Sequence, residues 1–166
     1  MSQALYAYTP PRAADGTDVP AGLVSYLNGH DLLAKTQAVR LSTVDPDGWP
    51  HAALLSAGDA VMLPGGRLRF VIFPESRTVA NLTRDGRITL TLSLDGGMCE
   101  LRMRARRLHA ASGQVSLALF EAQVGQVRQH VAPYADVTCG VTFALHDPEA
   151  VLARWQRQIA TLREAV

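Results

Sequence analysis

The sequence predicts a mainly β protein built on an antiparallel sheet or barrel, with short helices at its periphery. Roughly six segments alternate apolar and polar residues with period 2, as strands with one buried face do. Most of these segments are joined by short turns rich in Asp, Gly and Pro, and such turns connect antiparallel neighbours. Hydrophobic residues make up 48% of the 166 positions, which is enough for a full core.

Length and charge narrow the possible classes of function. No linker or repeat divides the chain, which predicts one domain over 1–166, with an N-terminal arm over 1–19 and a C-terminal helix over 147–166. The net charge is only +1, so nothing points to nucleic acid or an anionic membrane as a partner. No apolar stretch approaches the ~20 residues that cross a bilayer, and residues 1–20 lack the pattern of a secretory signal. We therefore expect a cytoplasmic protein.

The first half of the chain alternates between the helical and the strand period. It predicts a helix over 20–30, strands over 38–44, 50–57 and 67–73, and a helix over 76–83. The first helix is expected to end at Gly29, because glycine tolerates the left-handed conformation after a last helical turn. The first two strands form a hairpin, since the Asp-Pro-Asp-Gly sequence at 45–48 favours a tight turn. A second turn is predicted over 62–66, before the third strand.

The second half predicts strands over 87–94 and 99–108, a helix over 114–131, a strand over 136–145 and a helix from 147 onwards. The segment 114–131 is predicted to be helical because its apolar residues recur at spacings of three and four. These residues are Leu117, Phe120, Val124, Val127 and Val131. In the last helix, Asp147 is a good N-cap and Pro148 suits the first turn. The apolar stripe of that helix consists of Val151, Trp155, Ile159 and Leu162.

Cysteine and histidine spacing gives no metal site. Cys99 and Cys139 both alternate with apolar residues, so we expect two buried thiols in a reducing compartment rather than a disulfide. None of the five histidines pairs with another at a spacing of three or four residues, which would place two ligands on one helix face.

A polar cluster follows the third predicted strand, where a short helix begins. The first N–H groups of a helix lack internal partners and carry the positive end of the helix dipole. Ser76 and Thr78 add hydroxyl donors there, and Arg77 adds a guanidinium that suits phosphate oxygens. The cluster therefore predicts binding of a phosphate or carboxylate. The alternative is an ordinary N-cap by Ser76 beside a solvated Arg77.

The order of these elements and motifs resembles the pyridoxamine 5'-phosphate oxidase-like, FMN-binding split-barrel family. The resemblance is carried by residues 41–51, by 76–78 with 81–90, and by the strand 101–106, and it spans about 20–160. It implies a six-stranded antiparallel split β-barrel of the FMN-binding type. It also implies a homodimer that binds FMN in a cleft between its subunits.

The resemblance also implies the cofactor-binding residues. Residues near 53–56 would lie along the isoalloxazine ring, those near 71–73 would cover another part of the flavin, those at 76–78 would hold the phosphate, and Glu100 would bond the ring. The full set is Ala53, Leu54, Leu55, Ser56, Val71, Ile72, Phe73, Ser76, Arg77, Thr78 and Glu100. The family usually has Lys where this chain has Thr78, and often Arg where we align Ala53. No catalytic residue is identified.

Three functions remain open at this stage. The first is an FMN-dependent oxidoreductase that acts on a small-molecule substrate of unknown identity. The second is a protein that holds flavin, deazaflavin or haem without turnover. The third is an interaction protein that kept the barrel and lost the cofactor, which the neutral side chain of Thr78 favours. The intact Ser76-Arg77 helix start favours the first two.

Overall fold

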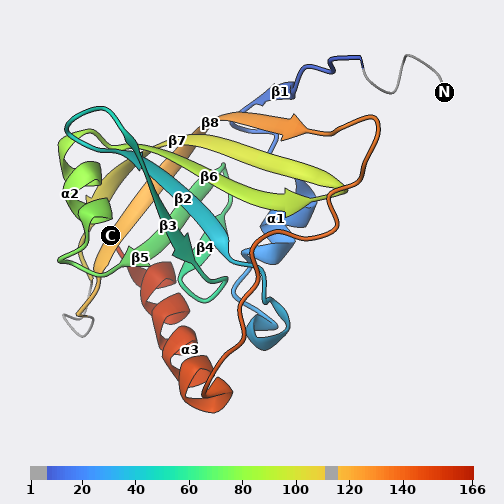
Figure 1. Cartoon of the computed structure of the whole chain (residues 1–166). Coiled ribbons are helices and arrows are strands. Elements are labelled where there is room, and N and C mark those ends of the chain that lie inside the picture. The colour runs from blue at the N-terminus through green and yellow to red at the C-terminus, as the bar shows by residue number, and fades with distance from the viewer. Residues whose placement is uncertain (1–6, 111–115) are drawn as a thin grey trace.

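The computed structural model describes residues 7–110 and 116–166. Their strands are β1 (Arg12–Asp15), β2 (Val39–Val44), β3 (Pro50–Leu55), β4 (Ala60–Leu63), β5 (Arg67–Ile72), β6 (Arg87–Leu94), β7 (Gly97–Leu108) and β8 (Ala118–His130). The helices are α1 (Ala21–Tyr26), the 3-10 turn η2 (Leu32–Ala34), α2 (Arg77–Arg84) and α3 (Pro148–Glu164). The strands form a curled antiparallel sheet with the helices around it (Figure 1).

The sheet has the strand order β3-β2-β6-β7-β8-β5-β4, and β1 adds to β8. The prediction of a mainly β, antiparallel split barrel is confirmed. The described part of the chain has eight strands where six were expected. Five predicted strands are present as β2, β3, β5, β6 and β7. The hairpin of β2 and β3 is also present, and Gly48 in its turn has a φ of 88°.

The predicted helix over 114–131 is wrong, because its described part contains β8. The reason is a bulge at Gly125, where the pairing of β7 with β8 shifts register between Arg102 and Met103. The extra residue separates the buried Val124 and Val127 by three positions instead of two. A bulged strand therefore acquires the spacing of a helix face. Residues 111–115, which include the start of the predicted helix, lie outside the described residues.

The predicted strand over 136–145 is also wrong. The segment is irregular and forms an isolated bridge, between Thr142 and Gln37, just before β2. It cannot extend along β2 itself, because β3 and β6 already pair with the two edges of that strand. Cys139 in this segment is exposed, which corrects the expectation of two buried thiols, whereas Cys99 is buried as expected.

Two short strands were not predicted. The first, β1, lies in the expected N-terminal arm, and β4 lies where the chain approaches the turn at 62–66. Each has only four residues, which is too short for a period to be recognised. The first helix is shorter than predicted and ends at Tyr26, although Gly29 does adopt a positive φ of 77°.

The C-terminal helix α3 packs across one end of the curled sheet, beneath β4 and β5 (Figure 1). Its predicted stripe is confirmed, since Trp155, Ile159 and Leu162 are all buried. Asp147 caps the helix by accepting a hydrogen bond from the N–H of Ala150 at 3.0 Å. Within the sheet, the rings of Phe70 in β5 and Phe120 in β8 stack with their centroids 5.6 Å apart. No helix within the described residues is long and apolar enough to cross a membrane.

Candidate ligand-binding site

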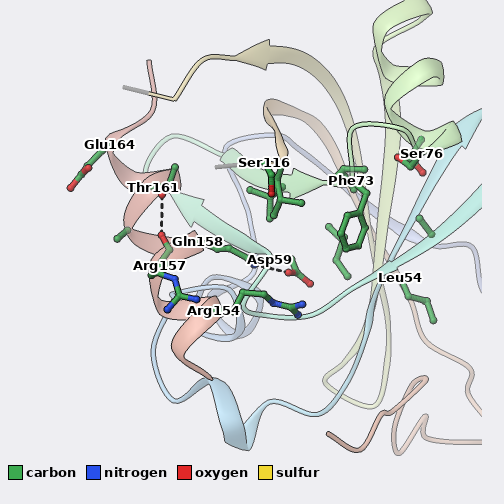
Figure 2. Close-up of a pocket in the computed structure, with 17 residues that line it drawn as sticks. Leu54, Asp59, Phe73, Ser76, Ser116, Arg154, Arg157, Gln158, Thr161 and Glu164 are labelled. Atoms are coloured by element: carbon green, nitrogen blue, oxygen red, sulfur yellow. Dashed lines mark hydrogen bonds between the residues drawn. The ribbon is translucent and has the colours of Figure 1, made fainter. Parts of the chain in front are cut away.

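A cavity of about 640 Å³ opens between the edge strand β3, the end of β5, the start of α2 and one face of α3 (Figure 2). Volumes of this size are typical of small-molecule sites. The residues that line it are Ala53, Leu54, Leu55, Asp59, Val71, Ile72, Phe73, Ser76, Thr78, Ser116, Leu117, Arg154, Arg157, Gln158, Ala160, Thr161 and Glu164.

One wall of the cavity is apolar and comes from β3 and the end of β5. Three consecutive residues of β3, at 53–55, line it. Because successive side chains of a strand point to opposite faces, this run shows that the cavity reaches the edge of β3. Within the described sheet that edge has no partner strand, so its backbone groups can bond a ligand. Leu54 and Phe73 stay 55% and 68% exposed beside the opening.

The start of α2 forms one end of the cavity. Ser76 is extended and caps the helix, with its hydroxyl accepting a hydrogen bond from the N–H of Val79 at 3.3 Å. Thr78, in the first turn, is 2% exposed and still lines the cavity. The unpaired N–H groups of the first turn and the helix dipole favour an anion at this end. Ser76 thus caps the helix, as one reading of the sequence expected, and it also lines the cavity, whereas anion binding stays a prediction.

The opposite wall comes from α3. The buried stripe of α3 packs on the core. A different face of the helix borders the cavity, and this face carries Arg154, Arg157, Thr161 and Glu164. The Nε2 amide of Gln158 donates to Oδ1 of Asp59 at 2.8 Å and to the carbonyl of Gly58 at 3.1 Å. These two bonds fix α3 to the turn between β3 and β4.

Ion pairs centred on the buried Glu121 hold the C-terminal end of α3. The guanidinium of Arg69 donates from Nε to Oε2 of Glu121 at 2.8 Å and from Nη1 to the carbonyl of Leu162 at 2.8 Å. Arg106 donates to the other oxygen of Glu121 at 2.7 Å. Burial alone would raise the pKa of Glu121, but the hydrogen bonds from Arg69 and Arg106 outweigh it and lower the pKa below its usual value. Glu121 thus stays ionised and orients Arg69 toward the end of α3.

The cavity brings together eight of the eleven predicted cofactor residues: Ala53, Leu54, Leu55, Val71, Ile72, Phe73, Ser76 and Thr78. Three others lie outside its lining. Ser56 is buried just behind it and donates its hydroxyl to Oδ2 of Asp59 at 2.7 Å. Arg77 is exposed. Glu100 lies on β7, where Arg102 bonds it at 2.9 Å.

Sequence reasoning missed the whole contribution of α3 and of Asp59. The apolar stripe of α3 predicted which of its residues would be buried in the core. The other residues of the helix were therefore expected on its exposed face. Nothing in the sequence indicated that this exposed face borders a cavity. Among the described residues no group of His, Cys, Asp and Glu could hold a metal ion.

The curled antiparallel sheet, with a cavity at its edge strand, defines the class of split β-barrels. Residues 29–137 match the model of the pyridoxamine 5'-phosphate oxidase family, and the chain belongs to this family. The matched range contains β3, β5 and α2 and ends before α3 begins.

Comparisons with individual proteins agree with the family. The chain is 34% identical over 143 residues to "Uncharacterized protein YclD" of Bacillus subtilis (strain 168), which covers 85% of this chain and 93% of that protein. A crystal structure of a "putative pyridoxamine 5'-phosphate oxidase" from Lactobacillus delbrueckii matches with a TM-score of 0.53 at 17% identity, over 72% of this chain and 98% of that one. HupZ of Group A Streptococcus matches with a TM-score of 0.52 at 13% identity, over the same shares of the two chains, 72% and 98%. The two structural likenesses show the fold.

Proposed function

We propose that the cavity binds FMN and that the protein is a flavin-dependent oxidoreductase acting on a small-molecule substrate. The observation that carries the proposal is the joining of three features in one cavity: an apolar wall, a free strand edge and a helix N-terminus. An isoalloxazine ring needs an apolar surface and hydrogen bonds along its polar edge, and a phosphate needs N–H and O–H donors.

The residues present fit this cofactor. Leu54 and Phe73 offer apolar surface beside the opening, and the edge of β3 offers backbone donors and acceptors. Ser76 and Thr78 offer hydroxyl groups to a phosphate at the start of α2. The neutral Thr78 replaces the usual Lys, and a hydrogen bond to a charged group contributes about 1.5–3 kcal/mol. We therefore expect FMN to bind roughly tenfold or more weakly than it would with that Lys.

When bound, the flavin supplies the capacity to exchange a hydride with a substrate. The chain's own part is to orient the ring against β3 and β5, to hold the phosphate and to exclude water. Leu54 and Phe73 are exposed at the mouth of the cavity, so one copy of the chain alone leaves the mouth open to water. This exposure supports the further proposal of a homodimer. A second copy that covered these two side chains would close the mouth.

The lining also supports a second function, which is to hold a flavin or deazaflavin without turnover. Of the described residues that line the cavity, the ionisable ones are Asp59, Arg154, Arg157 and Glu164. Asp59 already accepts bonds from the backbone and hydroxyl of Ser56 and from Gln158, so it is poorly placed to relay protons. Haem is favoured less, because this described lining contains no His, Cys, Tyr or Met as an axial ligand.

A charge substitution at Ser76 tests the phosphate site. Asn, Asp and Ser are comparable N-caps, so Ser76→Asp and Ser76→Asn both keep α2 capped and differ from each other in charge. We expect Ser76→Asp to weaken FMN at least tenfold while riboflavin, which lacks the phosphate, binds as before. Ser76→Asn, which adds no negative charge and keeps a polar donor at this position, should weaken FMN less than Ser76→Asp and should also spare riboflavin. Fluorescence titration of each variant with the two flavins measures this.

Two outcomes would count against the proposal. If wild-type protein binds neither flavin, the cofactor assignment fails. If FMN and riboflavin respond equally to Ser76→Asp, the phosphate does not lie at the start of α2. Reduction of bound FMN by a nicotinamide donor then separates an oxidoreductase from a holding protein, since a holding protein need not be reduced at a useful rate.

A further inference from the structure

Two arginines on α3 line the cavity at the end away from Ser76. Arg154 and Arg157 are one helical turn apart and extend from the same side of α3. In Figure 2 both arginines extend from α3, with Arg154 reaching toward Asp59, and Ser76 lies at the far side of the site beyond Phe73. The cavity therefore offers anion-binding groups at two separate places.

The packing of α3 fixes the direction in which these arginines point. Trp155 lies directly over Gly58, so closely that a Cβ added to Gly58 would be 2.0 Å from Cγ of the indole. Gln158 bonds the same turn through the carbonyl of Gly58 and Oδ1 of Asp59. With these two residues locked, α3 cannot rotate, and the positions at 154 and 157 face the cavity.

The positive charge of the pair is not neutralised by a salt bridge. Across 7–110 and 116–166, neither Arg154 nor Arg157 forms an ion pair with a carboxylate. Of the acids in the lining, Asp59 already accepts three hydrogen bonds. Glu164 lies seven positions beyond Arg157, which is about 10 Å along the helix axis. Both side chains are exposed, so their guanidinium groups are accessible to an oxyanion that enters the cavity.

We propose that Arg154 and Arg157 form an oxyanion subsite that binds the phosphate or carboxylate group of the substrate. The inference rests on the proposed function, because it assumes that the flavin phosphate lies at Ser76 and the ring against β3 and β5. A substrate held by α3 would then lie against the exposed part of the ring. The substrate class is a small organic anion, and α3 lies beyond the range that matches the family model.

The test uses the FMN-loaded protein and inorganic phosphate and acetate as probes. Phosphate should perturb the visible spectrum of the bound flavin in a saturable way, and the double variant Arg154→Gln, Arg157→Gln should weaken this binding at least tenfold. The double Lys variant should recover part of it, since it keeps the charge and loses the planar fork. Acetate in place of phosphate shows whether a carboxylate is accepted at the same residues.

A matched control is Arg163→Gln. Arg163 is also on α3 but donates to the carbonyl of Asn28 and does not line the cavity. Arg163→Gln removes one positive charge from the same helix and should leave phosphate binding unchanged. Thermal unfolding of every variant establishes that each is folded.

Three results decide the matter. Phosphate binding that does not saturate, or that survives the double Gln variant, overturns the subsite. If the double Gln variant weakens FMN and spares riboflavin, the arginines hold the flavin's own phosphate and the substrate subsite is overturned. If the protein binds no flavin, but phosphate raises the melting temperature of the wild type and not that of the double Gln variant, the oxyanion site stands and the proposed function fails.

Discussion

The side-chain amide of Gln158 donates a hydrogen bond of 2.8 Å to Oδ1 of Asp59, a residue 99 positions earlier in the chain. This bond joins α3 to the turn that follows β3. Both residues line the cavity, so the bond also sets the distance between its two walls. The geometry of the candidate site therefore depends on how α3 docks on the barrel.

Replacing Gln158 with Leu should destabilise the fold. The substitution leaves Oδ1 of Asp59 and the carbonyl of Gly58 without their donor, and an unsatisfied buried acceptor costs about 1–3 kcal/mol. Gln156, on the same helix, is exposed, and Gln156→Leu should change stability by less than about 0.5 kcal/mol. Urea unfolding of both variants measures the difference. Equal effects would show that the bond to Asp59 contributes nothing.

Substituting Gly58 should displace Trp155. A Cβ at this position would lie 2.0 Å from Cγ of the indole, so Gly58→Ala forces either α3 or the turn to move. Gly125→Ala is the control, because its Cβ would meet only the carbonyl of Arg102, at 3.7 Å. We expect Gly58→Ala to lower the melting temperature and to shift the tryptophan fluorescence toward that of an exposed indole. An unshifted spectrum with unchanged stability contradicts the close packing.

Acid should destabilise the protein partly through Glu121. The pKa of this residue is lowered in the fold from an ordinary value of 4.5, so its ionised form stabilises the fold above that pH. The contribution is lost as the pH falls through the folded pKa. Glu121→Gln should therefore lose stability at neutral pH, by about 3–5 kcal/mol if it behaves like other broken buried pairs. Its stability should then depend less on pH than that of the wild type in acid. Unfolding curves from neutral to acidic pH test this slope, and parallel slopes would contradict it.

The two cysteines should differ sharply in reactivity. Burial, together with the nearby charges of Asp95 and Glu100, raises the pKa of the Cys99 thiol to about 11. Cys139 is exposed. A thiol reagent at mildly alkaline pH should therefore modify one cysteine in the native protein and both after unfolding. Cys139→Ser should abolish the native reaction, and fast labelling of Cys99 instead would contradict its burial.

The sequence was sufficient where one strand face is buried and the turn residues are unambiguous. The alternation from Ile88 to Leu94 and the turn at 45–48 each have a single structural solution, and both occur as expected. The same holds for α3, whose cap at Asp147 and buried Trp155 follow from local rules.

Sequence reasoning failed where tertiary structure changes the local pattern. In β8, residues 118–122 are all buried, so no alternation of buried and exposed residues marks the strand there, and the bulge at Gly125 then shifts the period. Neither effect is visible without the neighbouring strands. The segment 136–145 shows the reverse, since its alternation is genuine but both edges of β2, the strand that it approaches, are already paired.

The candidate site also contains residues that the sequence predicts and residues that it does not. The predicted residues near 53–55, 71–73 and 76–78, apart from Arg77, line one cavity, and the family resemblance was the reason for expecting them together. The residues of α3 could not be predicted, because their role depends on the docking of Trp155 and Gln158 on the turn at Gly58. A polar helix face has no distinctive sequence pattern until its surroundings are known.

The most direct test of the central claim is the absorbance spectrum of the protein after incubation with excess FMN and removal of free ligand. We expect the visible absorbance of an oxidised flavin to remain with the protein. It should be lost in Ala53→Trp, which fills the cavity, and kept in Ala52→Trp, whose residue lies outside the lining. A colourless wild-type protein, or flavin retained equally by Ala53→Trp, would contradict the assignment of this cavity as a flavin site.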